Sequence, residues 1–220
     1  MKVLVIDIGG TNVKMLASGE EEIRKFPSGP TLTPTLMLRG VRKATADWDY
    51  DHITIGFPGP IKDGRLVMEP KNLGPGWLKF DFAARFGMPV RLVNDAAMQA
   101  LGSYEGGRML FLGLGTGMGT AFVMDGMVAP LELAHLPYKK DLTFEDWVGL
   151  RGLERLGKKK WQEAVDDVVA RLKDAFVADS VVLGGGNSKK LKYVPPGARL
   201  GDNTHAFLGG FRVWNDTKKR

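Results

Sequence analysis

Val3-Leu4-Val5-Ile6-Asp7-Ile8-Gly9-Gly10-Thr11-Asn12-Val13-Lys14 is the stretch of the sequence that decides the fold. Its apolar first half predicts a buried strand, its paired glycines a tight turn, and its last residues a second strand. Two adjacent glycines let the backbone adopt positive φ angles and bring its N–H groups close to a bound anion. The stretch therefore predicts a strand, turn and strand whose turn at Gly9 and Gly10 contacts phosphate groups.

Asp7 ends the first predicted strand, directly before the glycines. A carboxylate next to a phosphate would repel it, so this residue makes sense mainly if Mg²⁺ lies between the two. Thr11 adds a hydroxyl donor and Lys14 a positive charge. A plain hairpin with a solvated aspartate is the alternative interpretation, but the whole string from Asp7 to Lys14 favours a phosphate site.

Composition and length set the outer limits. The chain has 220 residues, 44% of them apolar, which suffices for one large domain or two small lobes. No run approaches the roughly 18 apolar residues of a membrane span, and no signal-peptide pattern precedes the first strand. Zero cysteines exclude thiolate metal sites, and three histidines leave little for a metal cage. We expect a soluble, cytoplasmic protein with no membrane partner, whose metals have oxygen ligands.

The net charge of +6 is concentrated in short basic runs, namely Lys139-Lys140, Lys158-Lys159-Lys160, Lys189-Lys190 with Lys192, and Lys218-Lys219-Arg220. Such a surplus raises the local concentration of polyanions without identifying one. Solvated surface is the ordinary explanation, and a groove for a long polyphosphate is the competing one. Nucleic acid is not expected as a partner, because no aromatic-rich RNA motif or helix-turn-helix signature accompanies the charge.

Asn94 and Asp95 stand between a predicted strand at 90–93 and a predicted helix at 96–105. The ends of strands are where α/β proteins place their ligands. An aspartate at this point is also a good helix N-cap. Asn94 can supply the cap instead, which would leave Asp95 to point at a ligand.

Two further segments carry polar side chains whose roles stay open. Asn72 and Trp77 flank a turn, which fits an Asx-turn with a packed aromatic ring as well as a side chain that binds a sugar. Glu132 precedes His135 by three residues. The two can be surface polar residues, or they can offer a bidentate acceptor and a tunable donor to vicinal hydroxyls.

The chain repeats its opening pattern from Met109 onward, with a strand, a glycine turn at 113–119 and a second strand at 120–124. Ile8-Gly9-Gly10 aligns with Leu114-Gly115-Thr116, so Gly115, Thr116 and Gly117 form the second candidate phosphate turn. The pseudo-repeat predicts two related lobes that face each other, unless the likeness is due to chance. We expect an N-terminal lobe at 1–106, to which 204–216 returns as a terminal helix, and a C-terminal lobe at 107–203.

A third glycine run, Gly184-Gly185-Gly186, follows a buried strand at 180–183 and precedes a predicted helix. This arrangement is typical of a nucleotide or anion site, and it also fits a turn that needs glycine only for close packing. Earlier in the same lobe, Thr143 and Asp146 predict a capping box at the start of a helix that Gly157 ends. A second amphipathic helix follows it.

The ordered set of motifs resembles ROK-family sugar kinases, which belong to the sugar kinase, heat-shock 70 and actin superfamily. The resemblance rests on Asp7 to Lys14, Asn94-Asp95, Gly115 to Gly119, Glu132-Leu133-Ala134-His135 and Gly184 to Gly186. The likeness is strongest to the polyphosphate glucokinases, through 70–126 and 181–189. It implies an α/β protein with the actin-like ATPase (ribonuclease H-like) fold, in two lobes with a central cleft.

The resemblance also implies an activity: transfer of a phosphoryl group to the 6-hydroxyl of glucose or a similar hexose, from ATP or polyphosphate, with Mg²⁺. Asp95 would be the general base. The sugar-binding residues would be Asn72, Asn94, Glu132 and His135. The donor would be held by Asp7, Gly9, Gly10, Thr11, Lys14, Gly115, Thr116, Gly117, Gly184 and Gly185, with Asp7 next to the metal. A homodimer is expected.

Three departures from the family pattern accompany the resemblance. Ala134 stands where the family has glycine, the cysteine-rich zinc motif of many members is absent, and the chain is shorter after His135. No zinc is therefore expected, and His135 is left to serve the sugar. The alternatives are a non-catalytic sugar sensor on the same fold and a kinase for another sugar or a non-sugar acceptor.

Overall fold

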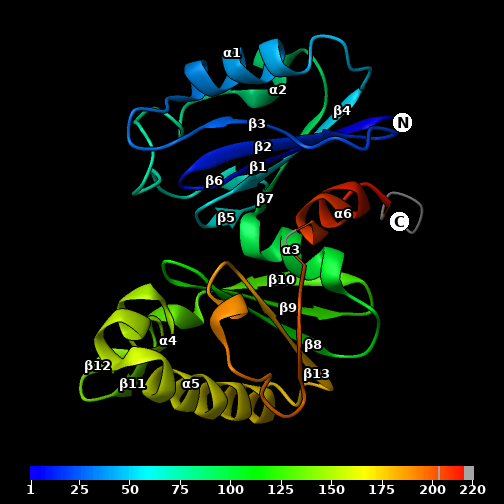
Figure 1. Ribbon diagram of the computed structural model, residues 1–220. Helices are drawn as coiled ribbons and strands as arrows, with labels where there is room; N and C mark the ends of the chain where they lie inside the picture. The colour runs from blue at the N-terminus through cyan, green and yellow to red at the C-terminus, as the bar shows by residue number, and fades with distance from the viewer. Residues whose placement is uncertain (203, 216–220) are drawn as a thin grey trace. The chain divides into compact units, whose positions relative to one another are not determined.

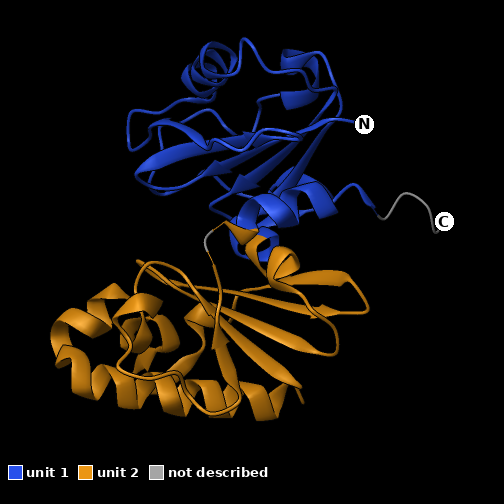
Figure 2. Ribbon diagram, turned by 45° about the vertical axis from the view of Figure 1, so that its right-hand side comes forward, with its two compact units in different colours: residues 1–98, 206–220 blue, residues 99–205 orange. Residues whose placement is uncertain are grey.

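The structure, a computed structural model, describes residues 1–202 and 204–215. These residues form two compact units, coloured separately in Figure 2: unit 1 is Met1–Met98 with the described residues from Ala206 onward, and unit 2 is Gln99–His205. The division falls inside α3 (Asp95–Ser103). The lobe boundaries expected from the sequence stay a prediction, and residue 216 and the basic tail at 218–220 lie outside the described residues.

Unit 1 is built on a five-stranded sheet in the order β3-β2-β1-β4-β7 (Figure 1). Its strands are β1 (Val3–Ile8), β2 (Asn12–Ala17), β3 (Arg24–Pro27), β4 (His52–Phe57) and β7 (Val90–Asn94). β2 is antiparallel to β1 and to β3, whereas β4 is parallel to β1 and to β7. The strands expected from the apolar runs are therefore confirmed, and the carboxyl ends of three of them share one edge of the sheet.

Alternation along β1 directs its side chains to two different cores. Leu4, Ile6 and Ile8 pack with α1 (Pro34–Ala44) and α2 (Phe82–Phe86), whereas Val3 and Val5 pack with α6 (His205–Arg212). Figure 1 shows these helices on opposite faces of the unit 1 sheet. The side chain of Asp7 continues the second series, so it lies on the face that α6 covers.

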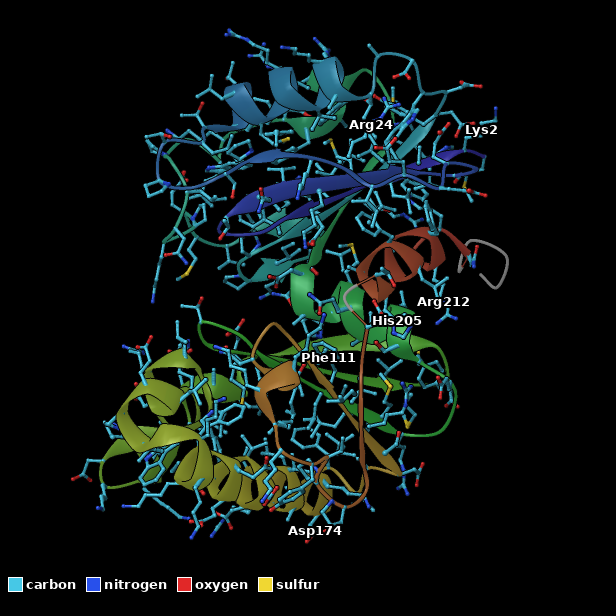
Figure 3. All side chains as sticks on the ribbon, in the orientation of Figure 1. Lys2, Arg24, Phe111, Asp174, His205 and Arg212 are labelled. Carbon is cyan, nitrogen blue, oxygen red and sulfur yellow. The ribbon has the colours of Figure 1, made fainter. Side chains whose placement is uncertain are left out.

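The ends of these helices follow the expected chemistry. Thr33 caps α1 by accepting a hydrogen bond from the Leu36 N–H at 3.4 Å, and Pro34 occupies the first turn. α6 is held on the sheet by Thr54, whose hydroxyl donates to the Gly210 carbonyl at 2.7 Å and accepts from the Trp214 indole at 2.8 Å. Of the terminal helix expected at 204–216, α6 covers His205–Arg212 (Figure 3), and residue 216 lies outside the described residues.

Unit 2 repeats the strand arrangement of unit 1 in the order β10-β9-β8-β13-β14. Its strands are β8 (Met109–Leu114), β9 (Met118–Met124), β10 (Met127–Leu131), β13 (Ser180–Gly184) and β14 (Ala198–Leu200). β8 and β10 are antiparallel to β9, and β13 is parallel to β8 and β14. The pseudo-repeat is thus confirmed in topology, and that its halves face each other stays a prediction.

The two glycine turns differ by one residue. In unit 1 the last paired residues are Ile8 and Val13, and in unit 2 they are Leu114 and Met118. The turn of unit 2 is therefore one residue shorter, although both turns follow the strand that aligns in the sequence. Equivalent turn residues consequently do not take equivalent positions around the loop.

Unit 2 buries one face of its sheet under α4 (Phe144–Val148) and α5 (Leu150–Ala175). The capping box of Thr143 and Asp146 is confirmed. The single helix predicted from there to Gly157 is wrong, because the chain breaks at Gly149. A Cβ there would lie 2.7 Å from the Glu145 carbonyl oxygen and 2.9 Å from that of Thr116, a space that only glycine fits. Gly157 does interrupt α5, with φ 71°.

Two other helix predictions need correction. The helix expected after Gly186 is only the 3₁₀ turn η2 (Ser188–Lys190), because Leu191 is extended. The helix expected at 96–105 is α3, which begins one residue earlier and ends at Ser103. The remaining elements are η1 (Leu133–His135) and the short strands β5 (Ile61–Lys62), β6 (Arg65–Leu66), β11 (Pro137–Lys139) and β12 (Leu142–Thr143). No helix in the described parts of the chain combines the length and apolar character of a membrane span.

Candidate active site

The predicted site residues fall into two sets, one in each unit. In unit 1, Asp7, Asn94 and Asp95 lie at the carboxyl ends of β1 and β7, where Asp7 pairs with Gly56 and Phe57 with Asn94. The Asn94 amide donates to the Gly59 carbonyl at 3.2 Å, which fixes the loop that follows β4. This is the edge at which parallel sheets bind ligands.

Asp7 is a carboxylate in a largely apolar setting. Its Oδ1 would lie 3.6 Å from a Cβ added at Gly56, and that added atom would also collide with Met98, so the glycine makes room for both side chains. Burial raises the pKa of Asp7, and the charge of Lys14, its cross-strand partner on β2, works against that rise. A half-buried carboxylate with one nearby cation is suited to a further positive charge.

The first glycine turn differs from the expectation in its backbone. Positive φ angles were expected at Gly9 and Gly10, but neither residue has one, so that expectation is wrong. The Gly9 N–H donates to the Asn12 carbonyl at 3.0 Å and so closes the turn. A Cβ at Gly10 would meet nothing within 4 Å, and Thr11 next to it is exposed. The exposed tip at Gly10 and Thr11 is therefore the part of the turn that a ligand can reach.

Asn94 and Asp95 begin α3. The Asn94 Oδ1 accepts a hydrogen bond from the Ala97 N–H at 3.0 Å, which confirms the interpretation in which Asn94 supplies the helix cap. The half-buried Asp95 accepts at 2.8 Å from the Ala96 N–H through Oδ1. This hydrogen bond holds the Asp95 carboxylate at the first turn of α3.

Asn72 and Trp77 lie in different environments. Trp77 is fully buried, donates its indole N–H to the Gly74 carbonyl at 2.6 Å and lies 5.2 Å from the ring of Phe57, centroid to centroid. It is a core residue, as the structural interpretation of this segment requires. Asn72 is exposed, and its predicted part in sugar binding stays a prediction.

In unit 2 the second and third glycine runs lie against each other. The Asn187 amide donates to the Gly115 carbonyl at 2.8 Å, and the Asn187 N–H donates to the Leu114 carbonyl at 2.9 Å. Gly185 has φ +78°, and a Cβ there would collide with the Leu114 backbone. Close packing therefore accounts for this glycine. Asn187 is a positioning residue that the sequence interpretation missed, although it directly follows the glycine run.

Glu132 directly precedes η1 and His135 is its last residue; both are exposed. Among the described residues no hydrogen bond joins their side chains. His135 instead approaches Glu145, with 3.9 Å between Nδ1 and Oε1. The reason is a hairpin: the Phe144 N–H donates to the Leu136 carbonyl at 3.1 Å, so the residues just outside this closure are neighbours.

Glu145 is the main residue that sequence reasoning missed. Its side chain is 20% exposed, its Oε1 lies 3.3 Å from an Arg151 nitrogen, and its Oε2 abuts the Cα of Gly117. It thus links the second glycine turn to His135. Its only signal in the sequence is an acidic residue after the Thr143 cap, which a helix start explains by itself.

Asp167 holds this hairpin on α5. It accepts hydrogen bonds from the Tyr138 hydroxyl, from Lys139 Nζ at 2.9 Å and from Arg171 Nε at 3.0 Å. Burial alone would raise the pKa of Asp167, but these three hydrogen bonds lower it to about 2. Tyr138 also stacks on Phe144, with 5.0 Å between ring centroids.

Replacing Asp167 by asparagine is expected to weaken the fold at neutral pH by about 1 kcal/mol, after allowance for solvent screening. Because the folded pKa lies below the unfolded value of about 4, this stabilisation is present above pH 4 and is lost as the pH falls through about 2. Urea unfolding at pH 7, 4 and 2 measures it. Asp174→Asn on the same helix (Figure 3) is the control and should leave the pH dependence unchanged; an equal loss in both variants would contradict the account.

The side chains that could bind a metal ion decide which kind of Mg²⁺ site the protein can form. Within residues 1–202 and 204–215, no group of three or more His, Cys, Asp or Glu side chains could hold a metal ion. Mg²⁺ is commonly bound through one or two carboxylates together with substrate phosphates and water. The half-buried carboxylate of Asp7 fits an ion of that kind, one that arrives with a phosphate donor.

The comparisons with known proteins agree with this geometry. The family model described as the ROK family matches residues 3–130. The chain belongs to the ROK family. A polyphosphate glucokinase of Mycobacterium tuberculosis is 24% identical over 213 residues, which cover 86% of this chain and 80% of that protein. The similarity to this glucokinase therefore extends over both units of the chain.

Solved structures extend the likeness to the fold. The inorganic polyphosphate/ATP-glucomannokinase from Arthrobacter sp. strain KM has a TM-score of 0.79 at 25% identity and covers 96% of this chain and 97% of its own. A ROK family glucokinase from Streptomyces griseus, in complex with glucose and AMPPNP, has a TM-score of 0.74 at 17% identity, with 97% and 99% covered. This member of the ROK family has the actin-like ATPase fold.

Proposed function

We propose that the protein is a hexose kinase that phosphorylates the 6-hydroxyl of glucose or a similar sugar, with ATP, polyphosphate or both as donor and with Mg²⁺. The observation that carries the proposal is the placement of Asp95 and Asp7 at one sheet edge, at the ends of β7 and β1. Two carboxylates in different surroundings suit two roles: one can accept a proton and the other can hold a cation. The ROK relatives with glucokinase activity in their names support the same reaction.

Asp95 acts as the general base in this proposal. It accepts the proton of the sugar 6-hydroxyl while the sugar oxygen forms its bond to the transferred phosphorus and the bond to the donor's leaving oxygen breaks. The products are a hexose 6-phosphate and either ADP or a polyphosphate shortened by one unit. The hydrogen bond from the Ala96 N–H holds the Asp95 carboxylate in place.

The sugar is bound by Asn72, Asn94, Glu132 and His135, to which we add Glu145 because it lies next to His135. A carboxylate and an imidazole together can accept from and donate to neighbouring hydroxyls. Asn94 already donates to Gly59 and accepts from Ala97, so it reaches the sugar with its remaining hydrogen and lone pair. Its position is therefore fixed before a substrate binds.

The donor phosphates are held by the turn at Gly9 to Thr11 with Lys14, and by Gly115 to Gly117 with Gly184 and Gly185. Mg²⁺ would neutralise phosphate charge, with Asp7 holding its water ligands. Most of the rate enhancement then comes from positioning and charge neutralisation, as phosphoryl transfer requires. We expect the protein to act as a cytoplasmic homodimer.

A hexose panel tests the proposal. Glucose, mannose, fructose and N-acetylated hexosamines are offered with Mg²⁺ and either ATP or polyphosphate, and hexose phosphate is measured in a coupled assay. We expect turnover of at least one hexose with at least one donor, and none without Mg²⁺. If no sugar is phosphorylated while calorimetry detects sugar binding, the protein is a sugar sensor and the proposal is wrong.

A further inference from the structure

Three lysine runs that are distant in the sequence meet on α5 of unit 2. Gln162, only 5% exposed, joins two of them: its Oε1 accepts from the Lys192 N–H at 3.0 Å and its Nε2 donates to the Tyr193 carbonyl at 3.3 Å. The loop that carries Lys192 is thereby held beside the helical turn that follows Lys158–Lys160. Gln162 is a buried polar side chain whose contacts fix the course of this loop.

A pocket of about 250 Å³ joins the third run to the same helix. Three lysines and a tryptophan line it, together with three other residues of α5: Lys139, Lys140, Trp147, Leu156, Lys160, Glu163 and Ala164. The hairpin between β11 and β12 forms one wall and α5 the other. We call Lys139, Lys140, Lys158, Lys159, Lys160 and Lys192 the lysine surface; all six are exposed.

The positive charge of the lysine surface is largely uncompensated. Asp167 pairs with Lys139 but also with Arg171, and Asp166 accepts hydrogen bonds from Gln162 and from the Tyr193 hydroxyl. Within the described residues, none of the other five lysines has an ion pair. Glu163 is the one acidic residue that lines the pocket. Clustered unpaired cations repel one another, and a polyanion relieves that repulsion and releases its own counterions.

The lysine surface continues from the second glycine turn along the chain. Asn187, which holds the Gly115 carbonyl, is followed by η2 and then by Lys192. Lys192 follows Asn187 by five positions, so their Cα atoms lie at most about 18 Å apart. A phosphate chain that begins at the glycine turn can therefore extend to Lys192. ATP has an adenosine in place of further phosphates.

We propose that the lysine surface binds the distal part of an inorganic polyphosphate chain, while the reacting end lies at the glycine turns. The biological purpose of this binding rests on the proposed kinase function, whereas the binding itself can be measured without it. Lysines bind phosphates as point charges, which suits a flexible chain with no fixed register. It predicts long-chain polyphosphate binding that depends strongly on salt, and ATP use that does not depend on these lysines.

Charge reversal tests the proposal directly. Lys158→Glu with Lys160→Glu is compared with a matched unit 1 variant, Lys43→Glu with Lys79→Glu, which has the same net charge. Binding of fluorescent long-chain polyphosphate is measured by anisotropy at several salt concentrations. We expect at least about tenfold weaker binding and a shallower salt dependence in the first variant alone. Equal binding by both variants would overturn the proposal.

A second variant has the opposite expected sign. Glu163→Gln removes the one carboxylate of the pocket, so it should tighten polyphosphate binding by about two- to fivefold, as expected for a single surface charge. Unchanged or weaker binding, with the thermal melting temperature unaltered, would count against the pocket. The last measurement replaces polyphosphate with single-stranded RNA that has the same number of phosphates. Equally tight RNA binding, lost in the same lysine variant, would replace the assignment with a general polyanion surface.

Kinetics separate this inference from the proposed function. In the lysine variant the KM for long-chain polyphosphate should rise at least about tenfold, and the KM for ATP should stay within about twofold. If the protein phosphorylates no hexose but binds polyphosphate through these lysines, the proposed kinase function is wrong and the polyphosphate-binding role of the lysine surface stands. If the protein is a kinase and the lysine variant raises the KM values for ATP and for polyphosphate equally, the role of the lysine surface is wrong and the kinase function stands.

Discussion

Asp95→Asn is expected to lower the rate of hexose phosphorylation by at least about 100-fold, since general-base catalysis typically contributes 10²- to 10⁴-fold. The asparagine keeps an oxygen that can accept the hydrogen bond from the Ala96 N–H, so α3 should begin as before. The loss should therefore appear in kcat, with the KM for the sugar changed little. Steady-state kinetics with glucose and ATP measure it.

The control for this prediction is the adjacent cap. Asn94→Asp keeps the acceptor for the Ala97 N–H but removes the amide that donates to Gly59. We expect this variant to raise the KM for the sugar more than it lowers kcat, which is the reverse of the Asp95 pattern. Full activity of the Asp95→Asn protein with an unchanged melting temperature would show that Asp95 is not the base.

Asp7→Asn is expected to have opposite effects on stability and activity. Above the folded pKa of Asp7 the variant should have a larger free energy of unfolding than wild type, because a neutral amide replaces a half-buried charge. Its phosphoryl transfer should fall by at least about 100-fold, because the cation that neutralises the donor phosphates loses its protein anchor. Urea titration and the coupled assay measure the two effects.

The pH dependence gives this prediction a sign that can be checked. Burial raises the folded pKa of Asp7 above its unfolded value. The destabilisation by the ionised carboxylate is therefore full above the folded pKa, shrinks as the pH falls below it, and is gone below the unfolded pKa. The stability difference between variant and wild type should therefore shrink on acidification. Asp125→Asn, at an exposed turn, is the control and should change neither property. A destabilised Asp7→Asn protein would show that the carboxylate is satisfied in the fold.

Local sequence patterns predict much of the fold. The alternation in 3–8 places Leu4 and Val5 in different cores, and the repeat of strand, turn and strand gives both sheets their common topology. Caps are also local, which is why the capping box of Thr143 and Asp146 forms where the sequence predicts it and why Asn94 is one of the two caps that the sequence offers for α3. These features depend on residues only a few positions apart. The spacing of apolar residues and the chemistry of helix caps determine them.

The site features that sequence reasoning missed depend on distant contacts. Glu145 reaches His135 only because the hairpin closes between Leu136 and Phe144. The break at Gly149 comes from the approach of the Thr116 carbonyl, from a different part of the chain. The ring of Phe111 occupies the space that a Cβ at Gly184 would need, so the sequence could offer close packing there only as one of two alternatives. No local pattern encodes such neighbours.

The central claim, that this ROK protein transfers a phosphoryl group to the 6-hydroxyl of a hexose, is tested most directly by the structure of its product. Wild-type protein is incubated with glucose, Mg²⁺ and ATP, or with polyphosphate in place of ATP, and phosphorus-31 NMR correlated to protons is recorded. The account predicts a new sugar phosphate whose phosphorus couples to the C6 protons. A phosphate on any other hydroxyl, or no sugar phosphate with either donor at protein concentrations that bind glucose, would contradict it.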